Sequence, residues 1–375
     1  MHYQETLDML TLASALHFTP DVATALYRKT GSAAAAMAAG AGAGDIMPGC
    51  NGRTAEALRH TDAARRKAEA ELEYAMRNGI KIMCLGDDTY PLRLKECTDA
   101  PPVMFFKGTA DLNCRHIVSI VGTRRCTSYG QDCVRRFVGR LQELCPDTLI
   151  VSGLAYGIDI CAHREALAAG TATVGVLAHG LDYLYPPRHK DTADEMLARG
   201  GLLTEHFTRT NADKLNFLRR NRIVAGMADA VIVAESAFHG GALVTARIAG
   251  SYGRDVFAFP GRVGDEMSEG CNNLIRDNKA ALITSADDFV KAMGWETDAR
   301  IGLMRRQGIE RSLFPELSPG EQAVAELLKK ENDLQINTIA ARTGTPVGTL
   351  TATMFSLEMK GVVKARAGGI YHLID

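Results

Sequence analysis

The residues best suited to bind a ligand lie between positions 217 and 246, where basic side chains precede an apolar strand pattern and a glycine turn. The basic cluster consists of Arg219, Arg220 and Arg222. The strand pattern ends at Glu235, and Gly240-Gly241 then opens another helical stretch. Free backbone N–H groups and the dipole at a helix N-terminus attract anions, and arginines donate paired hydrogen bonds to phosphate oxygens. We therefore expect a partner that carries phosphate, which is either a nucleotide or a nucleic acid.

Two earlier glycine turns are similar, because each follows an apolar strand pattern and opens a helix. In the first, Gly122 permits a tight turn and Arg124 can reach an anion. In the second, Ser152 and Gly153 leave the strand and expose backbone N–H groups. Neither turn has G-x-G-x-x-G spacing and no acidic residue holds the ribose position, so the dinucleotide fingerprint is absent. Carboxyl ends of parallel strands meet at one sheet edge, and the three turns together predict an extended phosphate-binding surface.

Several side chains near these turns allow more than one interpretation. Phe217 either stacks on a base, which contributes about 1–3 kcal/mol, or packs in the core of a helix. Asp159 and His163 share one helix face, and without a third ligand nearby they indicate a cap or a surface pair rather than a metal or catalytic site. Glu235 either acts as a general acid or base, or caps the glycine turn or pairs with Arg222, and we favour the structural role.

The composition is that of a globular protein with two or three domains. The chain has 375 residues, 46% of them apolar, and its 43 basic and 44 acidic residues give a formal net charge of -1. A binding site for a polyanion must therefore be a local patch. No apolar run is long enough to span a membrane, and the N-terminus lacks a signal-peptide pattern. The nine cysteines are dispersed, which favours reduced thiols in the cytoplasm over disulfides or a zinc site.

Three zones of different composition predict three domains. Residues 1–76 are rich in alanine and helical in pattern. The glycines of the tract 33–44 fit either a helix-hairpin-helix (SAM-like) unit or a close helix contact, and the second is favoured. Residues 77–295 alternate β-rich runs with helical stretches, which predicts an extended Rossmann-like, doubly wound, mostly parallel α/β sheet. Strands are expected near residues 80–85, 103–107, 116–121, 148–152, 173–177, 201–204, 230–234, 255–258 and 281–283.

The last zone follows a polar connector, residues 296–317. Residues 318–375 predict three helices and a two-stranded hairpin, which is the pattern of a winged helix. In that motif the third helix normally enters a DNA groove. Here that helix, residues 346–360, has one terminal lysine and no arginine, which is a weak electrostatic footprint for DNA. A role in protein contact or in structure is at least as well supported.

An ordered set of motifs extends the prediction beyond single turns. It comprises VGTR (121–124), SGLAYGID-x3-H (152–163), Gly-Leu-Asp followed by Tyr-Pro (180–186), Thr-Glu (204–205), F-x2-RNRIVAG (217–226), VAES-x3-GGALVTA (233–246) and Phe-Pro-Gly (259–261). In this order the motifs resemble those of the DNA-processing protein A (DprA) family, also called Smf, over about residues 79–293. Members often carry an N-terminal helical domain and a C-terminal winged helix, and the flanking zones fit both.

The resemblance implies a cytoplasmic, non-enzymatic homodimer that binds single-stranded DNA and loads the recombinase RecA onto it during natural transformation. It further implies single-strand-binding protein as a partner, and no cofactor, metal or membrane. Phosphates would be held by Arg124, Lys214 and the Ser152-Gly153 turn, and Phe217 would stack on bases or insert between them. The positions that match the family's binding residues are Gly122, Arg124, Ser152, Gly153, Lys214, Phe217, Gly240, Gly241 and Thr245, with Arg219 and Arg222 in the same basic motif.

Two positions depart from the family pattern. Gly240 stands where members usually have serine, so this turn would bind through backbone N–H groups alone, and Lys279 stands where they usually have glycine. The alternative function is a nucleotide-binding enzyme, such as a phosphoribohydrolase on a related Rossmann-like fold. Against it, the Pro-Gly-Gly-x-Gly-Thr loop and the downstream glutamate of such enzymes are missing.

Overall fold

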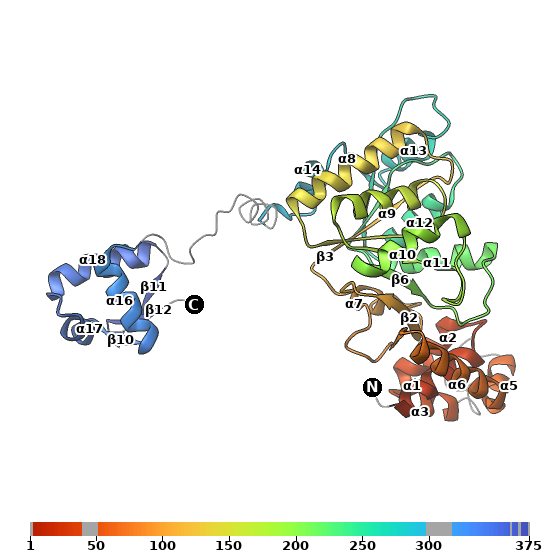
Figure 1. Cartoon of the computed structure of the whole chain (residues 1–375), viewed down its shortest axis with the longest axis horizontal. Helices are drawn as coiled ribbons and strands as arrows, with labels where there is room; N and C mark the ends of the chain where they lie inside the picture. The colour runs from red at the N-terminus through yellow and green to blue at the C-terminus, as the bar shows by residue number, and fades with distance from the viewer. Residues whose placement is uncertain (1–2, 40–51, 298–316, 361, 367–368, 374–375) are drawn as a thin grey trace. The chain divides into compact units, whose positions relative to one another are not determined.

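The computed structural model describes residues 3–39, 52–297, 317–360, 362–366 and 369–373. The chain divides into two compact units, residues 1–300 and residues 301–375 (Figure 1). Most of the predicted connector, residues 296–317, lies outside the described residues, as do the glycines at positions 40–44 of the N-terminal tract.

The described residues between positions 3 and 77 form helices joined by short turns, as the alanine-rich pattern predicts. These helices are α1 (Tyr3–Ala15), α2 (Pro20–Thr30), α3 (Ala33–Ala39), α5 (Gly52–Arg59) and α6 (Asp62–Arg77). Their buried side chains share one apolar core with residues of the adjoining sheet edge, where Phe105 and Phe207 pack edge to face with ring centroids 5.4 Å apart. The helices therefore pack directly on the sheet, and a domain boundary at residue 76 stays a prediction.

Within residues 52–297, nine strands form one sheet in the order β1-β2-β6-β5-β4-β3-β7-β8-β9. The strands are β1 (Lys81–Cys84), β2 (Val103–Gly108), β3 (His116–Val121), β4 (Thr148–Ser152), β5 (Thr173–Val176), β6 (Gly201–Thr204), β7 (Ala230–Val233), β8 (Asp255–Ala258) and β9 (Ala281–Leu282). Neighbours from β6 through β9 pair in parallel, whereas β2 pairs antiparallel with both β1 and β6. The predicted doubly wound, mostly parallel α/β architecture is confirmed.

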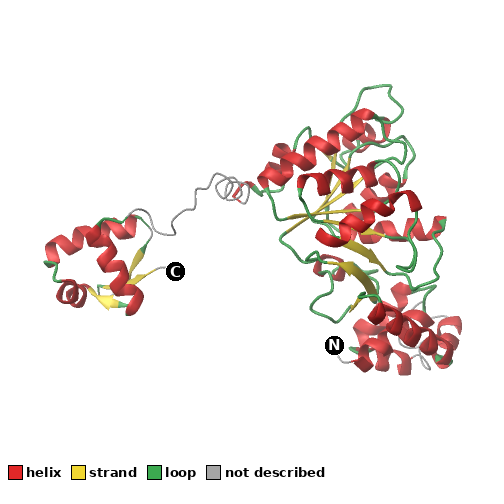
Figure 2. Cartoon of the chain, in the orientation of Figure 1, coloured by secondary structure: helices red, strands yellow, loops and turns green. Residues whose placement is uncertain are grey.

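Helices cover both faces of the sheet (Figure 2). One face carries α8 (Ser128–Leu144), α9 (Ile158–Ala169), α10 (Lys190–Arg199) and α14 (Ala286–Ala292). The other carries α7 (Leu92–Lys95), α11 (Lys214–Gly226), α12 (Gly241–Ser251) and α13 (Glu269–Arg276). The chain winds outward from β3 to β6 and then returns to the other side of β3 at β7. Ligands of open α/β sheets bind beyond the carboxyl ends of the strands at such a reversal point.

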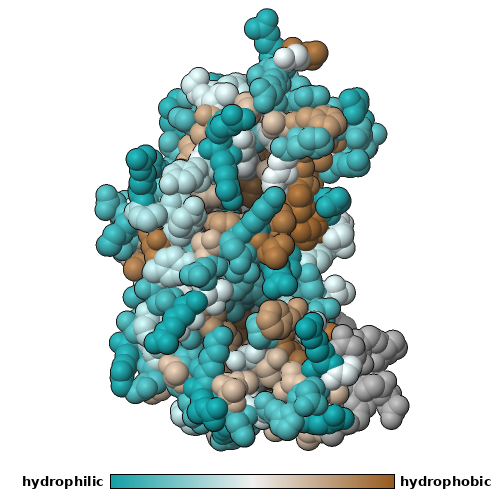
Figure 3. Space-filling model, turned by 90° about the vertical axis from the view of Figure 1, so that its right-hand side faces the viewer, coloured by the Kyte–Doolittle hydropathy of each residue, from teal (hydrophilic) through white to brown (hydrophobic). Residues whose placement is uncertain are grey.

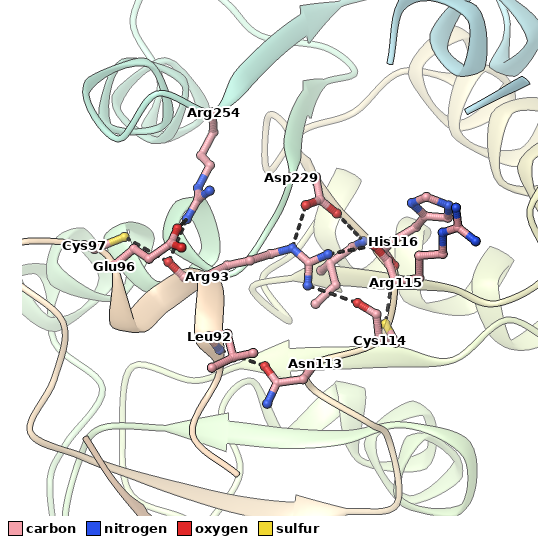
Figure 4. A network of polar contacts seen from close by, with 11 residues as sticks. Leu92, Arg93, Glu96, Cys97, Asn113, Cys114, Arg115, His116, Asp229 and Arg254 are labelled. Atoms are coloured by element: carbon pink, nitrogen blue, oxygen red, sulfur yellow. Dashed lines mark hydrogen bonds and ion pairs between the residues drawn. The ribbon is translucent and has the colours of Figure 1, made fainter. Parts of the chain in front are cut away.

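A polar network holds the amino-terminal ends of β3 and β7, at the sheet edge opposite the reversal-point loops (Figure 4). Arg93 of α7 donates to the Asp229 carboxylate at 2.6 Å and to the carbonyl oxygens of Cys114 and Arg115. Asp229 also accepts a hydrogen bond from the backbone N–H of Ile117 at 2.8 Å. Because these groups join three segments far apart in sequence, they hold β3 beside β7 and so support the loops at the other end of both strands.

Residues 317–373 form the predicted winged helix. Its elements are α16 (Pro319–Lys330), β10 (Leu334–Gln335), α17 (Ile336–Thr343), α18 (Val347–Met359), β11 (Val363–Arg366) and β12 (Ile370–Leu373). The strand β10 pairs with β12 and adds a third strand that the sequence pattern does not predict. Helix α18 buries Leu350, Met354 and Leu357 and exposes Phe355 and Met359. Its outer face is thus partly apolar, which accords with its lack of arginine.

Candidate nucleic-acid interface

A cleft of about 720 Å³ lies at the carboxyl ends of β3 and β7, where the strand order reverses. It is lined by the loop after β3, the loop after β7, the start of α9 and the N-terminal parts of α11 and α12, together with Tyr185 and Met267. Figure 3 shows the side of the molecule on which α11 and α12 lie, where polar side chains cover most of the surface and apolar patches gather in the upper half. The cleft is therefore positioned where a doubly wound sheet binds its ligand.

Backbone hydrogen bonds join the three loops, as the sequence predicts. The N–H of Thr123 donates to the carbonyl of Glu235 at 2.8 Å, and the N–H of Ile158 donates to the carbonyl of Thr123 at 3.1 Å. A Cβ at Gly122 would lie 2.4 Å from the Ile158 side chain. Glycine is therefore required at position 122 by the close contact of the first two loops.

Glu235 has a structural role, but not the one predicted. Its buried carboxylate accepts hydrogen bonds from the backbone N–H of Thr127 at 2.8 Å and from the Thr127 hydroxyl at 2.6 Å. The same hydroxyl accepts from Gly130 N–H and caps α8. Glu235 thus supports the start of α8, and pairs neither with Arg222 nor with its own glycine turn. Both carboxylate oxygens have partners and the side chain does not line the cleft, which weakens the case for a general acid or base.

Three of the predicted residues meet inside the cleft. Lys214 is the first residue of α11, whose N-cap Asp213 accepts from the N–H of Asn216 at 2.8 Å. One turn further along, Phe217 is half-buried, and the guanidinium carbon of Arg124 lies 4.9 Å from its ring centroid. Lys214 and Arg124 are exposed and line the cleft together with the ring. Phe217 is thus a cleft residue rather than a core residue, and two cations flank it.

Arg220, to which the sequence analysis gave no role of its own, is also part of the cleft. It is 4% exposed, lies 3.9 Å from the Asp159 carboxylate and has its guanidinium carbon 5.9 Å from the Phe217 ring centroid. Burial lowers the pKa of Arg220. Burial also raises the pKa of Asp159, although the positive charge of Arg220 acts to lower it. Within the described residues, the buried Nε of Arg220 has no hydrogen-bond partner. The floor of the cleft thus carries a cation, Arg220, whose charge the Asp159 carboxylate compensates only in part.

The second glycine turn, Ser152-Gly153, packs against the Arg220 side chain and does not form part of the cleft surface. A Cβ at Gly153 would lie 1.4 Å from an Arg220 guanidinium nitrogen, so glycine leaves room for that side chain. Ser152 is fully buried, and its hydroxyl donates to the carbonyl of Ile120 at 2.6 Å. Neither residue lines the cleft. The contacts of Ser152 and Gly153 are thus internal, and a phosphate contact at these two residues stays a prediction that the lining of the cleft does not support.

The three arginines of the basic run on α11, Arg219, Arg220 and Arg222, lie in three different environments. Arg219 is exposed but does not line the cleft. Arg222 is 9% exposed and forms an ion pair with Glu205, as well as a hydrogen bond to the carbonyl of Asp99. Residues two apart on a helix point in nearly opposite directions, so Arg220 and Arg222 cannot serve one site. Arg222 is held by internal partners, and its contact with DNA stays a prediction that this geometry does not support.

The predicted pair of Asp159 and His163 is not a surface pair, because both side chains are buried. His163 Nδ1 lies 2.7 Å from the Thr173 hydroxyl, and burial lowers the pKa of His163 to about 3. Asp159 is directed to Arg220 instead. Within the described part of the chain, no three His, Cys, Asp or Glu side chains gather as a metal site would require.

The third loop contributes backbone groups and one hydroxyl. Gly240 and Gly241 are exposed at the N-terminus of α12 and line the cleft, without a side-chain cap. Thr245 also lines it, and its hydroxyl donates to the carbonyl of Gly241 at 3.2 Å. A Cβ at Gly240 would lie 2.9 Å from the hydroxyl of Ser236. Ser236 thus brings a hydroxyl close to the position where family members usually have serine.

Comparison with known proteins identifies the family of this chain. Residues 81–294 match the family model of the DNA recombination-mediator protein A, and residues 312–369 match that of the DprA winged helix domain. The chain belongs to the DNA recombination-mediator protein A family. Protein Smf of Escherichia coli (strain K12) is 33% identical over 331 residues, which cover 85% of this chain and 84% of that protein. The predicted family is confirmed.

Two solved structures of DNA processing protein A are similar to this chain. The X-ray structure from Streptococcus pneumoniae is 36% identical with a TM-score of 0.57, covering 64% of this chain and 84% of that chain. The Helicobacter pylori structure, which concerns a single-stranded DNA binding mode, is 27% identical with a TM-score of 0.52, covering 57% of this chain and 95% of that chain. Among the described residues of this family member, no helix is long and apolar enough to cross a membrane.

Proposed function

We propose that this chain is a non-enzymatic recombination mediator that binds single-stranded DNA and loads RecA onto it. The observation that carries the proposal is the meeting of Arg124, Lys214 and Phe217 in one cleft. Two exposed cations can hold phosphates while an aromatic ring stacks on a base, and this combination binds a strand without regard to its sequence. The solved Helicobacter pylori relative, whose structure concerns single-stranded DNA binding, supports the same ligand.

Fluorescence anisotropy of a labelled oligothymidine at several salt concentrations tests the DNA-binding part. Arg124→Ala and Lys214→Ala should each weaken binding and reduce the slope of log affinity against log salt by about 0.7, the value for one phosphate contact on a single strand. Lys190→Ala is the matched control, because Lys190 is exposed, pairs with Asp194 on α10 and does not line the cleft. If the two cleft variants bind as the control does, the cleft is not the DNA site.

A filament assay tests the mediator part separately. RecA is added to single-stranded DNA that is coated with single-strand-binding protein, with and without the full chain. Faster filament formation is expected with the chain and not with Arg124→Ala. Absence of any stimulation would remove the mediator role and leave DNA binding in place. Light scattering of the purified chain tests the proposed homodimer. We expect the proposed activity to operate in the cytoplasm, during natural transformation.

A further inference from the structure

A second aromatic side chain, Tyr185, lines the same cleft beside Phe217. The ring of Tyr185 is 44% exposed, its centroid lies 6.0 Å from that of Phe217, and the two ring planes differ by 58°. It comes from the segment after β5, which faces the start of α11. In the sequence Tyr185 is only part of the motif at residues 180–186, and no role of its own is predicted for it.

The backbone around Tyr185 is fixed although the ring is exposed. The N–H of Tyr185 donates to His179 Nε2 at 3.1 Å, while His179 Nδ1 lies 2.8 Å from the carbonyl of Gly180. These partners assign a neutral His179 that carries its proton on Nδ1, and burial lowers the pKa of His179 in agreement. On the other side, Pro186 is buried and its carbonyl accepts from the N–H of His189 at 3.1 Å. An exposed ring on a fixed backbone is prepared for contact with a ligand.

We propose that Tyr185 is a second base-stacking residue, and that one nucleobase of a single strand inserts between its ring and that of Phe217. This inference rests on the proposed DNA-binding function. A base between two parallel rings needs a centroid separation of about 7 Å, twice the contact distance of about 3.5 Å between carbon atoms. The observed 6.0 Å therefore has to widen by only about 1 Å, with rotation of the tilted rings.

The surrounding charges suit such an inserted base. Arg124 lies over the Phe217 ring and Lys214 begins the same helix, so the phosphates on either side of the base can reach a cation. Stacking is open to every base, because each has a π-face. Tyr185 should therefore raise affinity for all single strands alike and create no sequence preference.

Substitutions that remove only the aromatic ring test this proposal in the full chain. Tyr185→Leu keeps apolar volume and should weaken oligothymidine binding about 5- to 150-fold, which corresponds to a stacking contribution of 1–3 kcal/mol. Tyr185→Phe should bind as the wild type does. Tyr156→Leu is the matched control, since Tyr156 is 42% exposed in the loop after β4 but does not line the cleft. Circular dichroism and thermal melting confirm that each variant is folded.

Abasic oligonucleotides locate the stacked base. A series of oligothymidines is cut to the shortest length that binds with full affinity, so that only one register is available. Oligothymidines of this length, each lacking one base, are measured with the wild type, Tyr185→Leu and Phe217→Leu. If one base lies between the rings, there should be one abasic position at which Tyr185→Leu and Phe217→Leu bind almost as tightly as the wild type. On that strand the stacked base is already absent, so neither substitution has stacking to remove. This shared position is expected only for insertion between the two rings.

The outcomes separate this inference from the function on which it rests. If Phe217→Leu weakens binding while Tyr185→Leu binds within twofold of the wild type, the Tyr185 assignment is wrong and the proposed function stands. Equal losses in Tyr185→Leu and Tyr156→Leu, or losses that add at every abasic position, also overturn it. If the wild-type chain binds no oligothymidine, the proposed function fails and the assignment fails with it.

Discussion

Replacing Asp159 by asparagine should make this protein less stable and a stronger DNA binder at once. Asp159 is 8% exposed and stands 3.9 Å from Arg220, which is 4% exposed. Two unit charges at about 4 Å interact by roughly 4 kcal/mol at an effective dielectric constant near 20. Removing one partner of a buried ion pair typically costs 3–5 kcal/mol, because the other charge stays buried without compensation.

We expect the low end of that range, a loss of about 3 kcal/mol in the free energy of unfolding. Burial raises the pKa of Asp159, so the charged carboxylate is itself penalised in the folded state. Asparagine avoids that penalty and can still accept from the N–H of Ala155, which now lies 3.4 Å from the carboxylate. These two effects offset part of the lost attraction to Arg220.

The same substitution removes one negative charge from the lining of the cleft. Affinity for oligothymidine should rise about fivefold, which corresponds to about 1 kcal/mol of repulsion removed in well-solvated surroundings. Urea unfolding followed by fluorescence of Trp295, the one tryptophan of the chain, reports the stability of the first unit. Fluorescence anisotropy reports the affinity.

Asp132→Asn is the matched control for both measurements. Asp132 pairs with Arg135 on α8 at 2.5 Å. The two side chains are 38% and 59% exposed and therefore well solvated, so the loss should stay below about 1 kcal/mol. Asp132 does not line the cleft, and DNA affinity should not change. The reasoning fails if Asp159→Asn is as stable as Asp132→Asn, or if it binds DNA more weakly than the wild type.

Three further outcomes follow from particular contacts. Gly153→Ala should displace Arg220 and lower the stability of the first unit in urea unfolding. Gly139→Ala is its control, because a Cβ at position 139 meets nothing within 4 Å, and it should stabilise α8 by up to about 1 kcal/mol. If the two variants are equally stable, Gly153 is not needed to make room for Arg220. Hydrogen bonds from Lys360 and neighbouring groups lower the pKa of Glu321 from 4.5 to about 2. Calorimetry should therefore show that the second unit loses stability as the pH falls from about 4.5 to about 2. Glu321→Gln should make the stability of this unit less dependent on pH over the same range. Burial lowers the pKa of His163 from 6.5 to about 3, so the unfolded state binds the proton at a higher pH than the folded state. The first unit should therefore lose stability as the pH falls below 6.5. His163→Asn should reduce this dependence of stability on pH by up to about 1.4 kcal/mol per pH unit, and an unchanged dependence would contradict the burial of a neutral His163.

Local patterns determined the elements of this fold and the place of the site. The central strands from β3 to β7 were predictable because parallel strands buried on both faces read as short apolar stretches, and a glycine turn after a strand marks a helix N-terminus. A doubly wound, mostly parallel sheet brings the carboxyl ends of its strands to one edge, and this predicted that the loops after β3 and β7 would meet. Gly122 and Arg124 were identified from their glycine turn, Phe217 from its place beside the basic run, and Lys214 from the family resemblance. All four line the cleft.

Only the tertiary structure decided which side chains face the ligand. The run Arg219 to Arg222 carries three cations with the same local signal, yet one is free, one lies under the cleft and one is held by Glu205. Glu235 likewise turned out to support α8 through Thr127, a residue 108 positions earlier in the chain. Such partners are chosen by the packing of segments far apart in sequence. Periodicity can therefore predict that a strand or helix forms, but not which distant group will occupy the space beside each of its side chains.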